Sequence, residues 1–290
     1  MRLESIRIHP VKSTAIRRVT CAQVGAAGLV GDREWMVVDA SGEMVSARTL
    51  PQLFRVVGEP TATGLRLTAP EAAQLEVAPL EVERPDAATG LMSASVFGSG
   101  PLPVRPAGAV ADAWFRAVTG HPQLRLVHCT DPTSRPLGPG LGRAGDHVAF
   151  QDSCPVTVLS LASVVRINDW MIETALGRGE GPPAPIDADR FRPNLVIDDA
   201  DAPFAEDHWA RIRIGGVVLR RAIPVSRCVM TTIDPADLSR GKEPIRTLAR
   251  HRAWGGKTWA AVHFVPEQTG HLAVGDDVTV LADDAQSTMT

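Results

Sequence analysis

Cys228, in the segment VSRCVMTTIDP, is the residue of this 290-residue chain whose surroundings best suit metal binding or nucleophilic chemistry. Arg227 stands next to it, and a neighbouring positive charge favours the thiolate, the form of cysteine that binds metals or attacks. The segment also lies between two strand-like stretches, in the kind of loop that often carries functional groups. A single cysteine is more often a small buried apolar residue, so both interpretations remain open at this point.

The other three cysteines give weaker signals. Cys21 and Cys129 lie in strand-like apolar stretches and are predicted to be core residues, whereas the pattern around Cys154 favours neither role. The four cysteines form no CxxC pair, which excludes a zinc ribbon and a thioredoxin motif, and their wide spacing excludes a plant-type ferredoxin cluster. The chain also contains no HExxH, GxSxG, P-loop or GxGxxG pattern.

Several basic residues fall in turn-like segments and together suggest a site for an anion. Lys12, Arg33 and Arg192 lie in the segments HPVKS, GDREW and RFRPN. A guanidinium fork matches phosphate geometry bidentately, and nearby hydroxyls and amides can serve the remaining oxygen atoms. The polar residues that would complete such a cradle are Ser13, Ser153, Asn194, Ser226 and Arg227. Each residue alone is typical of a solvated surface, and spacing does not show whether these segments meet in space.

Composition and charge limit the classes of protein to which this chain can belong. The formal net charge is -3, which argues against a general nucleic-acid binder. The 25 Gly and 23 Pro exceed average usage and predict many turns and short strands rather than a helical bundle. The N-terminus has no apolar signal core, and the longest weakly polar run, residues 155–165, is far shorter than the ~20 residues of a membrane helix. We therefore expect a soluble, cytoplasmic protein with reduced cysteines.

The elements that must position these residues are predicted mainly as strands. The length suggests two domains, and we place their boundary near residue 120, which gives segments 1–120 and 121–290. A hairpin is predicted around the Ser41-Gly42 turn, and the clearest helix, at 160–176, has apolar side chains at helical spacing. The further expected elements are a short helix at 109–118 that Gly120 ends, and strands at 65–67, 75–77, 124–129, 194–197, 211–220 and 278–281.

Several of these segments resemble, in order along nearly the whole chain, the MOSC family of molybdenum-cofactor-binding proteins. The N-terminal pattern appears as HPVKS at 9–13 and GLVGDREWMVVD at 28–39, followed by the AR at 47–48. The MOSC pattern appears as FQDSCPVTVLS at 150–160, RFRPNLVID at 190–198 and SRCVMTTIDP at 226–235. The resemblance implies a mainly β fold with some α (α+β), in which two β-barrel-like lobes enclose a cofactor cleft.

The same resemblance implies roles for particular residues. Cys228 would be the protein thiolate on molybdenum, since a soft ligand suits a metal already held by the two sulfurs of the molybdopterin dithiolene. Asp152 matches an acidic position close to the metal and would relay protons as the second catalytic residue. The implied cofactor-binding residues are Lys12, Ser13, Arg33, Ser153, Cys154, Arg192, Asn194, Ser226 and Arg227. This chain has Cys154 where Thr, Ser or a small residue is usual, and TTIDPADLSRG where members often have TTVDPDTG, so the loop after Cys228 is expected to differ in shape.

The implied activity is the molybdenum-dependent reduction of N-hydroxylated compounds, such as hydroxylamines, amidoximes or N-hydroxylated bases. Some bacterial relatives append a four-cysteine ferredoxin domain, and this chain ends without one, so a separate reductase and a small electron carrier are expected to supply electrons. The alternative is a module that binds or carries the cofactor or its sulfur without turnover of its own. Such a module would be similar to the C-terminal domain of cofactor sulfurases. Pyridoxal phosphate binding also goes with the family. We expect no nucleic-acid or membrane partner, and the oligomeric state is left open.

Overall fold

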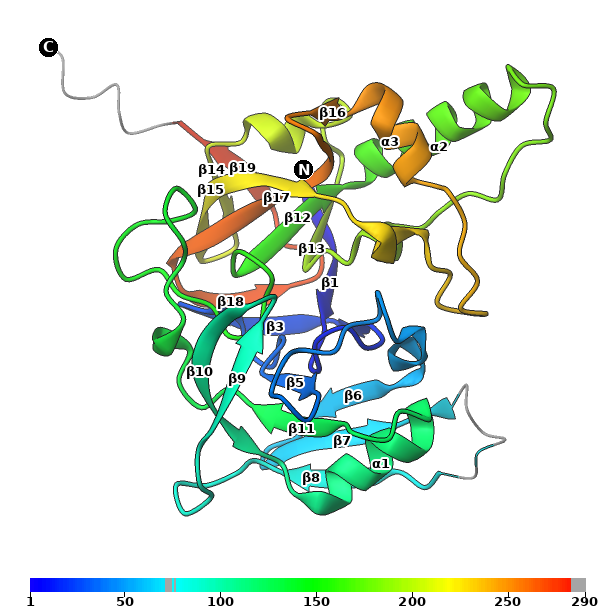
Figure 1. Cartoon of the computed structure of the whole chain (residues 1–290). Coiled ribbons are helices and arrows are strands. Elements are labelled where there is room, and N and C mark those ends of the chain that lie inside the picture. The colour runs from blue at the N-terminus through cyan, green and yellow to red at the C-terminus, as the bar shows by residue number, and fades with distance from the viewer. Residues whose placement is uncertain (71–74, 76, 283–290) are drawn as a thin grey trace, which may run out of the picture.

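A nine-stranded sheet forms most of the upper lobe of the computed structural model, which describes residues 1–70, 75 and 77–282 (Figure 1). Its path runs β19-β14-β15-β17-β12-β13-β1-β2, and β16 pairs with β17 off this path. Among the described strand pairs of this sheet, β12 and β13 are parallel and the others are antiparallel. The strands are β1 (Arg2–Ile8), β2 (Arg17–Val19), β12 (Val156–Ser160), β13 (Leu195–Asp198), β14 (Arg211–Ile214), β15 (Val217–Ser226), β16 (Ala253–Trp254), β17 (Lys257–Gln268) and β19 (Val278–Leu281).

Three smaller sheets complete the described part of the fold, in the orders β5-β11-β10-β9, β18-β3-β4 and β6-β7-β8. The mainly β, α+β class is therefore confirmed, but each described sheet has two unpaired edges, so the lobes consist of open sheets rather than closed barrels. The strands are β3 (Cys21–Gly25), β4 (Gly28–Leu29), β5 (Trp35–Val38), β6 (Val57–Pro60), β7 (Gly64–Thr68), β8 (Leu80–Glu83), β9 (Met92–Val96), β10 (Ser99–Pro106), β11 (Arg125–His128) and β18 (Gly270–Ala273).

Strand pairing between distant parts of the chain brings the predicted site segments together. Strands β1 and β13 are antiparallel, with Ile6 opposite Leu195, so the residues after β1 converge with those before β13. This places HPVKS next to RFRPN. The segments 1–120 and 121–290 also exchange strands, because β1 and β2 join the upper sheet while β11 pairs with β5. The division near residue 120 stays a prediction.

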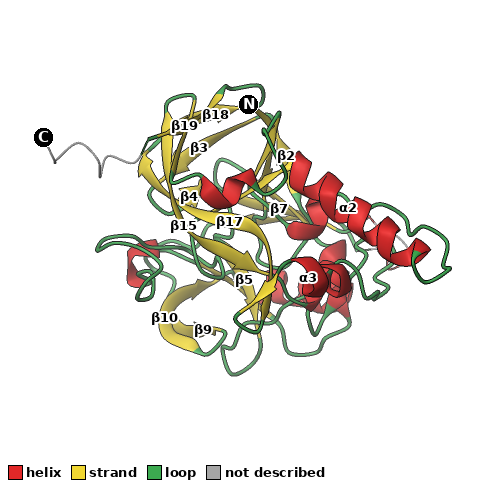
Figure 2. Ribbon diagram, turned by 90° about the horizontal axis from the view of Figure 1, so that it is seen from above, coloured by secondary structure: helices red, strands yellow, loops and turns green. Residues whose placement is uncertain are grey.

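Three α-helices occur in the described residues: α1 (Ala109–Thr119), α2 (Leu161–Leu176) and α3 (Ile245–His251). Two of them match the predicted helices. The Ser160 hydroxyl caps α2 by accepting from the Ser163 N–H, and α1 ends at Gly120, whose φ of 71° suits a left-handed cap. Figure 2 shows α2 and α3 together at one side of the strands. No helix within the described ranges is long and apolar enough to cross a membrane.

Most of the predicted strands are present, with some differences. Elements β7, β11, β13 and β19 cover the expected positions, and residues 211–220 divide into β14 and β15. The predicted hairpin turns at Gly42, but its return leg forms no strand; it makes one isolated bridge to β5, from Met44 to Val38, and another from Glu43 to Ser95. Residues 75–77 lie partly outside the described residues. The β9–β10 hairpin was not predicted, because its Gly/Ser/Pro-rich sequence is typical of a loop.

The prediction that Cys21 is a core residue is wrong. Cys21 lies in β3 and is exposed, whereas Val24 of the same strand is fully buried. Adjacent side chains of a strand face opposite sides, so the face that is covered decides which residues are core. Cys129 is half-buried and packs at the margin of a core cluster, and Cys154 is buried.

His128 is expected to make the folded protein less stable in mild acid. Its side chain is buried, its ring packs 4.5 Å from that of Trp35, and burial, followed by the charge of Arg84, lowers its pKa to about 4. The unfolded chain, with a histidine pKa of about 6.5, then binds more protons between these two values, so this contribution is present above pH 6.5 and is lost as the pH falls towards 4. The lost stability is at most about 3 kcal/mol.

Denaturant unfolding of wild type and His128→Gln at pH 7 and pH 4.5 measures this contribution. The variant side chain does not titrate, so the variant should show a smaller difference in unfolding free energy between the two pH values. An equal pH dependence in both proteins would contradict the assignment.

Candidate functional site

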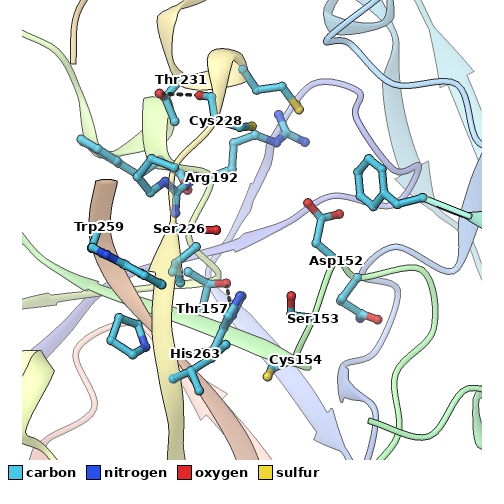
Figure 3. Close-up of a pocket in the computed structure, with 18 of the residues that line it drawn as sticks. Asp152, Ser153, Cys154, Thr157, Arg192, Ser226, Cys228, Thr231, Trp259 and His263 are labelled. Atoms are coloured by element: carbon cyan, nitrogen blue, oxygen red, sulfur yellow. Dashed lines mark hydrogen bonds between the residues drawn. The ribbon is translucent and has the colours of Figure 1, made fainter. Parts of the chain in front are cut away.

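A cleft of about 510 Å³ receives residues from both predicted segments of the chain (Figure 3). Figure 3 shows Ser226 and Cys228 on one segment, and Asp152, Ser153 and Cys154 on another, with open space between them. The predicted site residues that line it are Lys12, Ser13, Arg33, Asp152, Ser153, Cys154, Arg192, Ser226, Arg227 and Cys228. The tertiary structure therefore brings the anion cradle, the acidic residue and the candidate metal ligand into one cavity.

Cys228 lies two residues after the end of β15 and is the N-cap of the short 3₁₀ helix η6 (Val229–Thr232). Its backbone is extended, with φ -122° and ψ 178°, and its carbonyl accepts hydrogen bonds from the N–H and hydroxyl of Thr231 at 3.1 and 3.0 Å. These bonds hold the main chain, while the half-buried residue contributes to the cleft lining. The thiol is thus available to a ligand in the cleft.

Arg227 connects the Cys228 loop to the rest of the upper lobe. Its guanidinium donates to the carbonyl of Phe191 at 2.7 Å and to that of Ala260 at 3.3 Å. Burial lowers the pKa of Arg227 to about 10, although the interaction with Cys228 raises this pKa. Its Nε is buried without a hydrogen-bond partner among the described residues. Arg227 therefore positions Cys228 and still has an unsatisfied donor.

Lys12 and Asp152 form an ion pair at the cleft wall. The ammonium of Lys12 donates to the Phe150 carbonyl at 2.6 Å and to the Asp152 carboxylate. Burial lowers the pKa of Lys12 to about 8 against the opposing effect of Asp152. Burial raises the pKa of Asp152, but the charge and hydrogen bond of Lys12, together with Arg33, hold it well below its usual range. At neutral pH the proton of this pair therefore lies on Lys12, and Asp152 is the acceptor.

Arg33 and Arg192 have the left-handed backbone that non-glycine residues rarely adopt, with φ of 54° and 51°, and Ser13 shares it with φ of 68°. Arg33 donates to the carboxylate of buried Asp32 at 2.6 Å, and Asp32 also accepts from the His9 N–H at 2.7 Å. Backbone conformations of this kind cost free energy and tend to persist at functional sites. The cradle residues are thus held by the surrounding structure.

Arg192 has the clearest unfilled binding capacity in the cleft. Its Nη2 is buried and has no hydrogen-bond partner in the described part of the chain. Burial, followed by the charge of Arg33, lowers its pKa to about 9. A buried guanidinium nitrogen without a partner is costly, so an anionic ligand would relieve the penalty.

Asn194 does not line the cleft. Its side chain is buried, accepts from the Thr157 N–H at 3.1 Å and donates to the Arg7 carbonyl at 3.2 Å. It therefore joins β12 to β1 and lies 3.5 Å from the Arg33 guanidinium. Its place in RFRPN suggested a ligand contact, but its amide is used to hold the strands that carry the cradle.

Cys154 lines the cleft as a buried thiol, and burial raises its pKa to about 12. It is neutral at physiological pH, so it does not compete with Cys228 as a thiolate ligand.

Several residues of the cleft were not predicted. Arg48 lies 3.6 Å from Asp152, and its guanidinium stands 4.3 Å from the ring centroid of Phe97. It belongs to the AR pair at 47–48, so the motif could have identified it. Trp259 and His263 come from β17, which no motif marked, and burial followed by Arg227 lowers the pKa of His263 to about 4. The lining of the cleft is strongly positive, because Asp152 is the one acidic residue among its described lining residues and the basic ones are Lys12, Arg33, Arg48, Arg192, Arg227 and Lys257.

Family models match this chain in two parts. The MOSC N-terminal beta barrel domain matches residues 1–122, and the MOSC domain matches residues 145–279. Both ranges contribute residues to the cleft.

Curated relatives match over nearly the whole chain. Mitochondrial amidoxime-reducing component 1 of Homo sapiens is 32% identical over 94% of this chain and 81% of its own length. Mitochondrial amidoxime reducing component 2 of Rattus norvegicus is 29% identical over 97% and 83%. Among solved structures, the YUAD protein from Bacillus subtilis aligns with 96% of this chain and 93% of its own, at 11% identity and a TM-score of 0.39.

Proposed function

Because the chain belongs to the MOSC family, we propose that it is a molybdenum-cofactor-dependent reductase of N-hydroxylated compounds that receives electrons from a separate protein. The names of its relatives support the reaction class, since they are amidoxime-reducing components. The cleft supports the cofactor. The predicted cytoplasmic location and the association with pyridoxal phosphate stay predictions.

The observation that carries this proposal is the cluster of buried cations with unsatisfied donors around the Cys228 thiol. Arg192 Nη2 and Arg227 Nε have no hydrogen-bond partner within the described residues, and both atoms are buried. Their donors, with Lys12 and Arg33, would hold the phosphate and polar edges of the pterin, while Cys228 would provide the soft thiolate for molybdenum. When bound, the cofactor supplies the two-electron chemistry that cleaves the N–O bond.

The Lys12–Asp152 pair would supply protons to the reaction. Conversion of R–NHOH to R–NH₂ and water consumes two electrons and two protons. Lys12, with a pKa of about 8, holds a proton at neutral pH, and the ionised Asp152 accepts its hydrogen bond. A donor with a pKa near the working pH is suited to general acid catalysis. We infer that the pair, rather than Asp152 alone, moves protons at the cleft wall.

Metal content and turnover of the purified protein test this function. We expect stoichiometric molybdenum and reduction of benzamidoxime or 6-hydroxylaminopurine with an artificial reductant. Stoichiometric molybdenum without turnover of either substrate would instead support the module that only binds or carries the cofactor. Protein produced with full cofactor supply that never retains molybdenum would contradict both.

The protein is expected to be inactive with NADH or NADPH alone and to become active when a reductase and a small electron carrier are added. Its sequence has no nicotinamide fingerprint, and its four cysteines lack the spacing of an iron–sulfur cluster. Product formation is measured with each component omitted in turn. Turnover driven by NADPH and the purified chain alone, free of flavoprotein, would overturn this expectation.

A further inference from the structure

A concentrated positive charge lies on α3 and the neighbouring β16–β17 hairpin. Residues 240–257 contain six Arg and Lys and one acidic residue, a net charge of +5 in a chain whose formal net charge is -3. We call five exposed residues of this region the α3 surface: Lys242, Arg250, His251, Trp254 and Lys257. The helix and the hairpin are adjacent in Figure 1.

Few acidic groups neutralise this surface. Glu243 pairs with Arg246 at 2.6 Å, and Asp207 pairs with Arg252 at 2.5 Å. On the adjacent α2, Asp169 and Glu173 face Arg166 at 3.9 and 2.9 Å. The three exposed cations of the α3 surface have no ion-pair partner in the described part of the chain; they are Lys242, Arg250 and Lys257. The surface therefore favours an acidic partner.

Two stacked indoles connect the α3 surface to the cleft. The ring of Trp254, 46% exposed, lies 5.4 Å from that of Trp259, with 17° between their planes. Trp259 donates its indole N–H to the Trp254 carbonyl at 3.0 Å, and it lines the cleft (Figure 3). The turn between them is Gly255-Gly256, whose φ values of 58° and 71° allow the tight reversal that brings the indoles together.

We propose that the α3 surface docks a small acidic electron-carrier protein, whose electrons enter the cleft past the stacked pair of Trp254 and Trp259. The inference rests on the proposed function and adds the place and the chemical character of the electron donor. Each docking oxidises the carrier by one electron, so two dockings and two protons convert R–NHOH to R–NH₂ and water. Opposite charges steer such encounters, which are weak and use small interfaces, and an exposed tryptophan is suited to the centre of the contact.

An anionic membrane would also be attracted by the positive charge. It would not account for the second observation, an exposed indole that stacks on a residue of the cleft wall. An electron donor accounts for both, because it requires attraction at the surface and a short route to the cleft.

Binding of an acidic carrier to the full-length protein is the first test. The probes are oxidised plant-type ferredoxin and flavodoxin, measured by calorimetric titration at low and high salt. Reversal of two charges, in Lys242→Glu/Arg250→Glu, should weaken binding by about tenfold or more at low salt and flatten the salt dependence. Arg125→Glu is the control and should bind like wild type, because Arg125 is the exposed first residue of β11 in the other lobe.

Turnover with two kinds of reductant separates this inference from the proposed function. The charge-reversal variant should show a raised KM for reduced ferredoxin, with turnover by dithionite unchanged. Trp254→Leu should lower the ferredoxin-driven kcat, measured at saturating carrier, several-fold, while the dithionite-driven rate remains near wild type. Absence of dithionite-driven turnover in molybdenum-loaded wild type would refute the proposed function itself.

Three outcomes would overturn the docking inference while the proposed function stands. The first is that wild type binds neither ferredoxin nor flavodoxin. The charge-reversal variant could keep the carrier affinity of wild type. The same variant could instead lose binding to phosphatidylserine-containing vesicles alone, which would identify the α3 surface as a membrane-binding face.

Discussion

Replacement of Cys228 by serine is expected to abolish reductase activity, with a loss of more than about 100-fold, while the fold remains intact. Even residues that only support a metal ligand typically change activity by about 10- to 100-fold, so loss of the ligand itself should cost more. A serine oxygen is a harder and weaker partner for molybdenum than a thiolate. The fold should survive because Cys228 is held through its backbone carbonyl, which accepts both hydrogen bonds from Thr231.

The measurements are turnover of benzamidoxime, molybdenum content and the denaturant midpoint of unfolding. Cys21→Ser is the matched control, since Cys21 is exposed on β3 and does not line the cleft. The control should retain the activity of wild type. Full activity of Cys228→Ser with normal molybdenum content would show that Cys228 is not the metal ligand.

Arg192→Lys is expected to reduce cofactor retention by roughly 10- to 150-fold, which corresponds to the loss of one charged hydrogen bond of about 1.5–3 kcal/mol. Lysine retains the charge but lacks the planar fork that can bind an anion bidentately. The buried Nη2 of Arg192 has no partner in the described part of the protein, so it is the donor that a bound anion would use.

Molybdenum and pterin retained after dialysis measure this effect without reference to activity. Arg190→Lys is the control from the same turn, because Arg190 pairs with Asp234 at 2.9 Å and does not line the cleft. Its cofactor content should remain much closer to wild type than that of Arg192→Lys. Equal retention in wild type and Arg192→Lys would remove Arg192 from the set of contacts.

The sequence alone was enough to predict helices and strands that are specified by residues close together in the chain. The helix at 160–176 was predictable because its apolar spacing, its Ser160 cap and the following Gly177 all lie within one stretch of chain. The strand β19 was predictable from its short apolar run for the same reason. The motifs also identified Cys228 and the cations of the cradle, although spacing could not show that they share a cavity.

The tertiary structure decided which residues meet and which face the core. HPVKS meets RFRPN because β1 pairs with β13, and that pairing forms between segments far apart in the chain. Cys21 is exposed although its strand looked like core, since the covered face of a strand depends on its neighbours in space. Asn194 does not line the cleft, because its side chain bonds to Thr157 and Arg7, which lie far from it in the sequence.

The protonation of the site also depends on three-dimensional neighbours. Lys12 and Asp152 are 140 positions apart in the chain, yet their contact keeps the proton on Lys12 although burial lowers the pKa of Lys12. Trp259 lies in the cleft because β17 packs beside β15, with Ser226 opposite it. Desolvation and charge pairing arise only when distant segments exclude water from one another, so local sequence patterns could name the reactive residues but could not assign their charge states.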